Sequence, residues 1–285
     1  MLDLFKNKKM SVKTIDFNRD IDSENGILYP SRVMLDMVNL KKVYPTPKGD
    51  YMVLEGLNLQ IMKEEFVTII GHSGCGKTTM LSMIAGLNPI SGGNISVLGH
   101  HIKGPGPDRG VIFQSPSLMP WMTSLQNVLL GVNQVFPDAT KAQRNDIAKY
   151  YLQKVGLEDA FNKRASELSQ GMQQRVGIAR AFAIKPKVLL LDEPFGMLDS
   201  LTRGELQDIL IEIWNKEKIT AVMITHDVDE AIFLADRVVM MTSGPKAKIG
   251  DILNIDFERP RTRKAVLEHD DYYKYRKHLI DFLEH

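Results

Sequence analysis

The sequence predicts an α/β protein built on a mostly parallel β-sheet. Short apolar runs, typical of buried strands, alternate with segments of helical periodicity. The run FVTII at 66–70 precedes a glycine-rich turn and an apolar helix. The runs KVLLLDEP at 187–194 and AVMITH at 221–226 flank a predicted helix at about 200–217, and RVVMMT follows at 237–242. Such alternation predicts parallel strands joined by helices.

The composition is that of an ordinary globular protein. The chain has 285 residues, 44% of them hydrophobic and 25% charged, which allows one large domain or two smaller ones. A formal net charge of +1 argues against a nucleic-acid binder. Cys75 is the one cysteine, so no internal disulfide forms. No run of about 18 apolar residues predicts a membrane-spanning helix, and we expect a cytosolic protein that can dock on a membrane protein.

Changes of character along the chain predict its organisation. Residues 1–32 are weakly patterned and predict a poorly ordered extension. β-like stretches at 33–44 and 51–61 flank the turn-rich PTPKGD, and ISVLGHHI and GVIFQ predict further strands. Residues of about 118–170 have helical periods and predict a helical insert. The tail at 246–285 predicts an extension with a terminal helix that packs on its own domain.

The segment GHSGCGKT, from Gly71 to Thr78, fits the phosphate-loop pattern G-x-x-x-x-G-K-[ST]. Glycines let the backbone curl until its N–H groups face phosphate oxygens, Lys77 reaches the β- and γ-phosphates, and the Thr78 hydroxyl can ligate Mg²⁺. An apolar strand before the loop and a helix after it support this interpretation over a chance glycine turn. Cys75 is interpreted as a small filler residue rather than a redox group. The predicted ATP contacts here are Gly71, His72, Ser73, Gly74, Cys75, Gly76, Lys77, Thr78 and Thr79.

Two acids end the buried run at 187–194. Asp192 is placed to hold the hydration shell of Mg²⁺, and Glu193 is placed to polarise a water that attacks the γ-phosphate. Two acids after an apolar run also fit a strand that simply ends in solvent. The pairing with the phosphate loop favours the catalytic interpretation.

Gln114 and His226 also end predicted strands, where parallel α/β sheets place their sites. A neutral amide can ligate Mg²⁺ and orient water, and an imidazole can contact the γ-phosphate. Either residue alone fits a satisfied loop residue. Their common place at the edge that carries Lys77 and Glu193 favours a role in the site.

A second glycine turn, ELSQGMQQR at 167–175, precedes a predicted helix at 172–183. Ser169 is a good N-cap, and a helix start with small residues can bind an anion through free N–H groups. The chain thus contains two predicted phosphate-binding turns.

These motifs, in this order, resemble the ATP-binding cassette (ABC) ATPases over residues of about 33–245. GHSGCGKTT resembles the phosphate loop, VLLLDE the Walker B strand, LSQGMQQR the family signature and MLDS, around Asp199, the D-loop. Gln114 resembles the Q-loop glutamine, His226 the switch histidine, and Tyr44 the aromatic residue that stacks on adenine. Gln170 and Met172 depart from the commoner signature LSGGQ, while Ser169 and Gly171 keep its pattern.

The resemblance implies a P-loop NTPase fold with a RecA-like core, an antiparallel β subdomain and a helical subdomain. It implies that two cassettes pack head to tail, with ATP between the phosphate loop of one copy and Ser169, Gln170 and Gly171 of the other. It also implies ATP and Mg²⁺ as ligands, with Thr78, Gln114 and Asp192 at the metal. The implied catalytic residues are Glu193, His226 and Lys77.

A single cassette with a short helical insert favours the energising subunit of a membrane transporter over a soluble ABC ATPase of translation or DNA repair. KGPGPDRGVIFQSPSLMPW resembles importer ATPases for nitrate, taurine and alkylsulfonates, and the tail, with Phe257 to Arg261, resembles the nitrate branch. Cyanate and bicarbonate importers are the alternatives.

The implied partners are a second ATPase subunit, identical or different, and membrane permease subunits at the cytoplasmic face of the membrane. An extracytoplasmic anion-binding protein is an indirect partner. The stretch 115–123, with Trp121, is predicted to dock the permease, although helical-insert core also fits it. The basic run Arg259, Arg261, Arg263 and Lys264 is interpreted as solvated surface rather than as a lipid-facing patch.

Overall fold

The central sheet of the protein has six strands in the order β10-β9-β3-β8-β7-β6. A computed structural model describes residues 32–284, so the predicted extension at 1–32 lies outside the described residues except for its last residue. The pairs β3–β8, β3–β9, β7–β8 and β6–β7 are parallel, and β10 pairs antiparallel with β9. The strands are β3 (Phe66–Gly71), β6 (Arg109–Ile112), β7 (Val188–Asp192), β8 (Thr220–Ile224), β9 (Arg237–Met241) and β10 (Ile249–Asn254).

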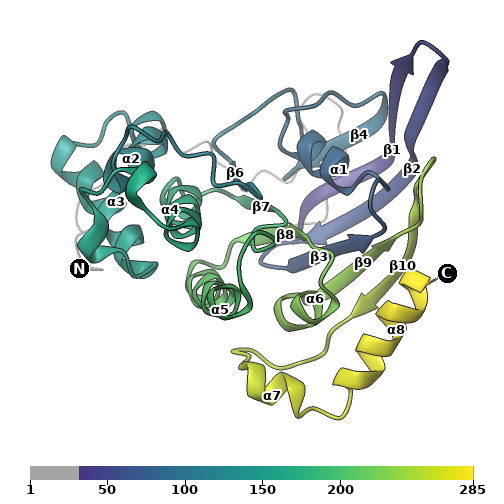
Figure 1. Ribbon diagram of the computed structural model, residues 1–285. Coiled ribbons are helices and arrows are strands. Elements are labelled where there is room, and N and C mark those ends of the chain that lie inside the picture. The colour runs from purple at the N-terminus through teal and green to yellow at the C-terminus, as the bar shows by residue number, and fades with distance from the viewer. Residues whose placement is uncertain (1–31, 285) are drawn as a thin grey trace.

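A second, antiparallel sheet lies over one face of the central sheet. Its order is β2-β1-β4-β5, and β1 and β2 form a long hairpin that extends beyond the body of the protein (Figure 1). The bounds are β1 (Val33–Thr46), β2 (Gly49–Met62), β4 (Gly92–Val97) and β5 (His100–His101). The helix α1 (Lys77–Ile84) lies with this sheet.

The alternation of side chains along the central strands creates two hydrophobic cores. In β3, Phe66 and Ile70 belong to the core beneath the central sheet, whereas Val67 and Ile69 belong to the core shared with α1 and the antiparallel sheet. Successive side chains of a strand point to opposite faces. A strand buried on both faces must therefore be apolar throughout, which explains the unbroken run FVTII.

Helices occupy the chain between β6 and β7 and form one side of the molecule (Figure 1). Capping boxes at Thr123 and Thr140 begin the first two of them, because each threonine side chain accepts from a backbone N–H three residues later. The elements here are α2 (Ser124–Val135), α3 (Lys141–Lys154), η2 (Glu158–Ala160), η3 (Ala165–Glu167) and α4 (Gln170–Ala183). They lie largely within the range predicted as a helical insert, except that α4 continues to the central sheet.

The C-terminal extension packs under the central sheet, against α5 (Ser200–Glu217) and α6 (Val228–Leu234). It contains α7 (Arg263–Leu267) and α8 (Tyr272–Glu284), and the buried side chains of Tyr272 and Leu279 belong to the core of the domain. The expectation that the terminal helix packs on its own domain is confirmed. No helix among residues 32–284 is long and apolar enough to cross a membrane.

The interpretation of the basic run as solvated surface is wrong for Arg259 and Arg261. Arg261 is buried and donates to the backbone oxygens of Ala235, Ile255 and Phe257. Arg259 pairs with Asp236 at 2.7 Å and lies 4.4 Å from the ring of Trp214. Guanidinium groups offer five donors, so they can satisfy carbonyls that strand and helix ends leave free. Lys264 and its neighbour Arg263 are not buried in this way, and Lys264 is exposed.

Candidate functional site

The phosphate loop connects β3 to α1, and the lysine that begins this helix closes the loop on itself. Lys77 Nζ donates to the backbone oxygens of Gly71, at 2.7 Å, and His72, at 3.0 Å. Gly76 has a φ of 94°, and a Cβ there would lie 2.7 Å from a methyl of Val53. Only glycine fits such a left-handed position against a neighbouring strand. The loop therefore has the shape that its glycines predict.

The hydroxyl of Thr78 donates to Asp192 Oδ1 at 3.1 Å. These residues begin α1 and end β7, so the structure brings together two of the three predicted Mg²⁺ ligands. Burial raises the pKa of the Asp192 carboxyl, while the hydrogen bond from Thr78 lowers it. Hard oxygen donors of this kind suit Mg²⁺, which protein sites hold with one or two carboxylates plus substrate phosphates. The residues present fit that ion.

Three predicted residues meet at one carboxylate oxygen. Glu193 Oε2 lies 3.3 Å from Gln114 Nε2, which donates to it, and 3.5 Å from His226 Nδ1. The three residues follow β6, β7 and β8, which are neighbours in the central sheet. Gln114 and His226 each stand two residues beyond the last residue of their strand rather than at its end. Because both residues lie beyond the ends of their strands, their side chains reach Glu193 in the loop after β7.

The backbone of Glu193 is itself unusual. It has a φ of 45°, in the left-handed region that residues with a Cβ seldom adopt. Its N–H donates to the Ile224 oxygen at 3.0 Å, so β8 holds the turn in place. Backbone conformations of this kind are found preferentially at functional sites.

The other predicted ATP contacts lie on the phosphate loop, in the first turn of α1 and on β1. Cys75 is fully buried, and its sulfur lies 3.8 Å from Lys77 Nζ, which fits the interpretation as a packed filler residue. His72, Ser73 and Gly74 are exposed at the loop surface. Thr79 lies in the first turn of α1. Tyr44 lies on β1 with its hydroxyl bonded to Asn88.

The second glycine turn begins α4 as expected. Ser169 caps the helix, and its Oγ accepts from the Met172 N–H at 3.3 Å. Ser169 and Gln170 are exposed, and a Cβ at Gly171 would lie 2.7 Å from a methyl of Thr202 on α5. The helix begins at Gln170, two residues before the predicted start. The described contacts of Ser169 lie within its own helix, so the structure does not bring it to the phosphate loop of the same chain.

Two residues of α4 that the sequence did not single out connect this helix to the site. Gln174 is buried and donates to the backbone oxygens of Pro194, at 2.7 Å, and Phe113, at 3.3 Å. Arg180 donates to the oxygens of Pro116 and Ser117, at 2.8 and 3.0 Å. Gln174 precedes the buried Ile178 and Phe182 by four and eight residues. A polar residue in line with an apolar helix face was the available signal.

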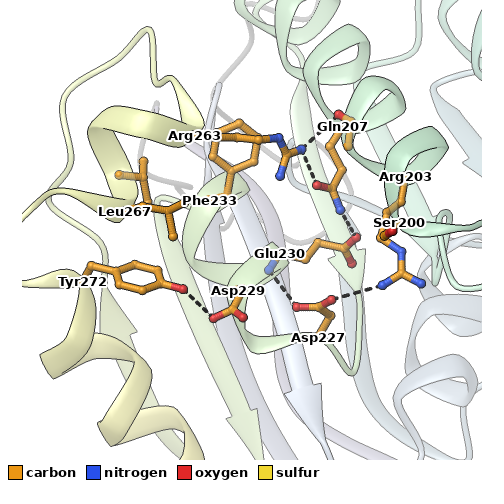
Figure 2. A pocket seen from close by; sticks show the side chains of 12 residues that line it. Ser200, Arg203, Gln207, Asp227, Asp229, Glu230, Phe233, Arg263, Leu267 and Tyr272 are labelled. Atoms are coloured by element: carbon orange, nitrogen blue, oxygen red, sulfur yellow. Dashed lines mark hydrogen bonds and ion pairs between the residues drawn. The ribbon is translucent and has the colours of Figure 1, made fainter.

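A cavity of about 160 Å³ lies between α5, α6 and α7, and Asp227, the residue after His226, is part of its lining (Figure 2). Arg203 donates to the Leu198 oxygen, just before Asp199, and pairs with Asp227 at 3.4 Å. Asp199 caps α5 and Asp227 caps α6, so Arg203 links the two turns that precede these helices. Hydrogen bonds from the amides of Thr202 and Leu201 lower the pKa of the Asp199 carboxyl.

The stretch after Gln114 is partly exposed rather than packed as helical core. Trp121 has 67% of its surface exposed. Met119 and Met122 are half-buried beside Trp121. An exposed indole next to methionines is typical of a surface that contacts another protein.

The fold and this site define a P-loop ATPase: a phosphate loop after a parallel strand, with acids at the end of a neighbouring strand. Comparison with known proteins narrows the class. The family described as "ABC transporter" matches residues 54–196. The chain belongs to the ABC transporter family.

Curated relatives and solved structures agree with this assignment. The chain is 52% identical to the bicarbonate transport ATP-binding protein CmpD of Synechocystis sp., over 87% of this chain and 88% of the relative. It is 48% identical to the nitrate import ATP-binding protein NrtD of Synechococcus elongatus, over 85% of this chain and 88% of that one. It matches the dimeric structure of MJ0796, a bacterial ABC transporter cassette, at 30% identity, with a TM-score of 0.71 over 79% of this chain and all of that one.

Proposed function

We propose that this chain is the ATP-hydrolysing subunit of an ABC importer for a small planar oxyanion, nitrate or bicarbonate. The observation that carries the hydrolytic part is the meeting of Gln114 and His226 at one oxygen of Glu193. The observation that supports the transported ion is the similarity to subunits named for bicarbonate and for nitrate. Nitrate and bicarbonate each carry three oxygens around one central atom, so closely related importers can differ in which of the two anions they transport.

In this proposal Glu193 accepts a proton from the water that attacks the γ-phosphate. A carboxylate can act as a base only if it is held toward the water. Gln114 donates to Glu193 from one side and His226 lies on the other, so the carboxylate is oriented before ATP arrives. Lys77 exchanges its bonds to loop oxygens for bonds to phosphate.

Mg²⁺ would be held by Thr78 and Asp192, with Gln114 beside them, and it would neutralise charge on the β- and γ-phosphates. Ser169, Gln170 and Gly171 would complete the site of a second copy, because the exposed start of α4 has free N–H groups and the positive end of the helix dipole. The dimeric cassette that this chain matches supports such a pairing.

Trp121 and its neighbours would contact a membrane permease subunit. The hydrogen bonds of Arg180 to Pro116 and Ser117 then connect that surface to α4. A displacement of the docked partner would move the start of the same helix. The site of this chain would thus lie at the cytoplasmic face of the membrane.

Uptake of labelled nitrate and of labelled bicarbonate tests the proposal, in a strain that lacks the chain and receives it back as wild type or as Glu193→Gln. We expect wild type to restore uptake of one anion, and Glu193→Gln to bind ATP but lower hydrolysis by a factor of roughly 10² or more, as expected for loss of a general base. The exposed Glu258→Gln should behave as wild type. Hydrolysis by Glu193→Gln at the wild-type rate would exclude Glu193 as the base, and unchanged uptake of both anions without the chain would exclude the transport role.

A further inference from the structure

Two side chains hold Tyr44, one at its hydroxyl and one at the face of its ring. Its hydroxyl accepts a hydrogen bond from Asn88 Nδ2 at 2.7 Å. The ammonium of Lys42 lies 4.7 Å from the centre of its ring. Tyr44 still has 37% of its surface exposed. Asn88 therefore holds the hydroxyl of Tyr44, and Lys42 lies near one face of the ring, while part of the side chain stays exposed.

Lys42 is not free to leave this position. It is only 5% exposed, and its Nζ donates to Asn88 Oδ1 at 2.7 Å and to the Pro89 oxygen at 2.6 Å. A buried ammonium must keep its partners, because losing them costs several kcal/mol. Asn88 thus bonds both groups at once: its oxygen accepts from Lys42, and its nitrogen donates to Tyr44.

Asn88 is also attached to the helix that carries the phosphate loop. Its backbone N–H donates to the Ser82 oxygen at 3.2 Å, and its Nδ2 lies 3.4 Å from Ser82 Oγ. Ser82 belongs to α1, which begins at Lys77. One side chain therefore connects the ring of Tyr44, on the antiparallel sheet, to the helix that begins at the phosphate loop.

We propose that Asn88 is a positioning residue that sets the ring of Tyr44 at a fixed place relative to the phosphate loop, so that the base and the phosphates of one nucleotide are bound together. The inference rests on the proposed ATPase function and on the expectation from the sequence that Tyr44 stacks on the adenine of ATP. Stacking needs a ring of defined orientation, and an exposed tyrosine without this bond rotates about its side-chain torsions at an entropic cost to binding. Asn88 does not touch the nucleotide; it acts through Tyr44.

A double-mutant cycle tests this, with the dissociation constants of ATP and of tripolyphosphate measured by titration calorimetry on the full chain. Tripolyphosphate has the phosphates and lacks the base. We expect Asn88→Ala and Tyr44→Phe each to weaken ATP binding by about fivefold, the effect of one hydrogen bond. The double variant should weaken ATP binding by less than the two single effects combined, because both single variants remove the bond between Asn88 and Tyr44, while Asn88→Ala also removes the bonds of Asn88 to Lys42 and Ser82. Binding of tripolyphosphate should change less than twofold throughout.

The exposed Asn133→Ala, on α2, is the matched control and should bind both ligands as wild type does. Equal weakening of ATP and tripolyphosphate in Asn88→Ala would overturn the inference, because it would indicate general damage to the loop. Additive effects in the double variant would overturn it as well. Tyr44→Ala separates the two levels: if it weakens ATP binding while Asn88→Ala does not, the inference alone fails, and if it leaves ATP binding unchanged, the stacking role of Tyr44 fails too.

Discussion

Glu230 carries a buried carboxyl group on α6, four residues after His226. Burial raises its pKa to about 7, against the opposing effect of hydrogen bonds from Thr225 and Gln207. Figure 2 shows the carboxyl turned toward Gln207 on α5. The charges that also act on it are those of Asp227, which raises the pKa, and Arg203, which lowers it. A carboxyl with this pKa changes protonation close to neutral pH.

The raised pKa predicts how stability depends on pH at this residue. The folded protein holds the Glu230 proton more tightly than the unfolded chain, whose pKa is about 4.5. The stabilising contribution is therefore complete below pH 4.5 and is lost as the pH rises to about 7. We expect Glu230→Gln to gain free energy of unfolding relative to wild type across that window, by on the order of 3 kcal/mol.

Urea unfolding of wild type and Glu230→Gln at steps between pH 4.5 and 8 measures this difference. The exposed Glu258→Gln is the control, and its difference from wild type should stay flat with pH. A flat difference for Glu230→Gln would mean that Glu230 titrates normally in the folded protein.

At the scale of residues, the sequence singled out the candidate nucleotide-binding groups better than the groups that hold them in place. Asp192 and Glu193 stand out because acids follow an apolar run. Arg261 was misjudged, because a run of four cations gives no sign of which guanidinium turns inward to bond carbonyls. Gln174 has the same character: its partners, the Phe113 and Pro194 oxygens, are fixed only after the sheet has formed.

Among the elements, α4 bears most directly on the two-copy site. Its start is exposed and capped by Ser169, while Gln174 and Arg180 fasten its length to the loops after β6 and β7. The middle and the C-terminal part of α4 are hydrogen-bonded to other parts of the chain, whereas its N-terminal end is exposed. An exposed helix start whose described contacts lie within its own helix suits a ligand on another molecule.

This arrangement predicts an asymmetric effect of Ser169→Arg. A long cation at the exposed helix start would block the approach of a second copy, without reaching the phosphate loop of its own chain. We expect ATP binding to the monomer to stay within about twofold, and hydrolysis that rises with protein concentration to fall by roughly 10² or more. Hydrolysis rates over a range of protein concentration, with calorimetric ATP binding, measure the two effects.

Loss of the helix cap alone costs about 1 kcal/mol of stability and needs its own control. Thr140→Arg removes the equivalent cap of α3 and places arginine at another helix start. It should hydrolyse ATP as wild type does. If Ser169→Arg behaves like Thr140→Arg, the start of α4 has no part in an intermolecular site.

Element order was readable from the sequence, whereas strand ends and neighbours were not. Apolar runs marked β3, β7 and β8 because strands buried on both faces cannot alternate. Within the order β8-β7-β6, the pairing of β6 with β7 joins residues more than 70 positions apart, as in Val111 with Leu190. That order is what brings Gln114 and His226 to Glu193. The sequence predicted their shared edge from the strand ends, whereas the meeting at one carboxylate oxygen depends on the fold.

At the scale of the whole molecule, two hydrophobic cores lie on the two faces of the central sheet, and the C-terminal extension covers the core that contains Phe66 and Ile70. Arg261 is a buried charged residue where the extension packs on the rest of the domain, and its side chain is only 1% exposed. Desolvation lowers its pKa to about 10, so it remains charged at neutral pH. Removing it would leave the carbonyls of Ala235, Ile255 and Phe257 without this donor.

We therefore expect Arg261→Met to lower the free energy of unfolding by about 2–4 kcal/mol, through loss of the hydrogen bonds to buried carbonyls. Lys264→Met, three residues later and exposed, should cost less than about 0.5 kcal/mol. Urea unfolding followed by circular dichroism compares the two. Equal stability of the two variants would show that the extension does not depend on this arginine.

The way Arg261 fastens the extension decides where the chain tolerates added sequence. Between β10 and α7 the backbone is fixed on both sides of a buried charge, so an inserted tag or reporter there would have to pull a guanidinium out of the protein interior. The end of α8 has no such fastening, since Glu284 is exposed and the helix is held by Tyr272 and Leu279 further back. An affinity tag or fluorescent protein intended to leave the fold intact belongs after that helix.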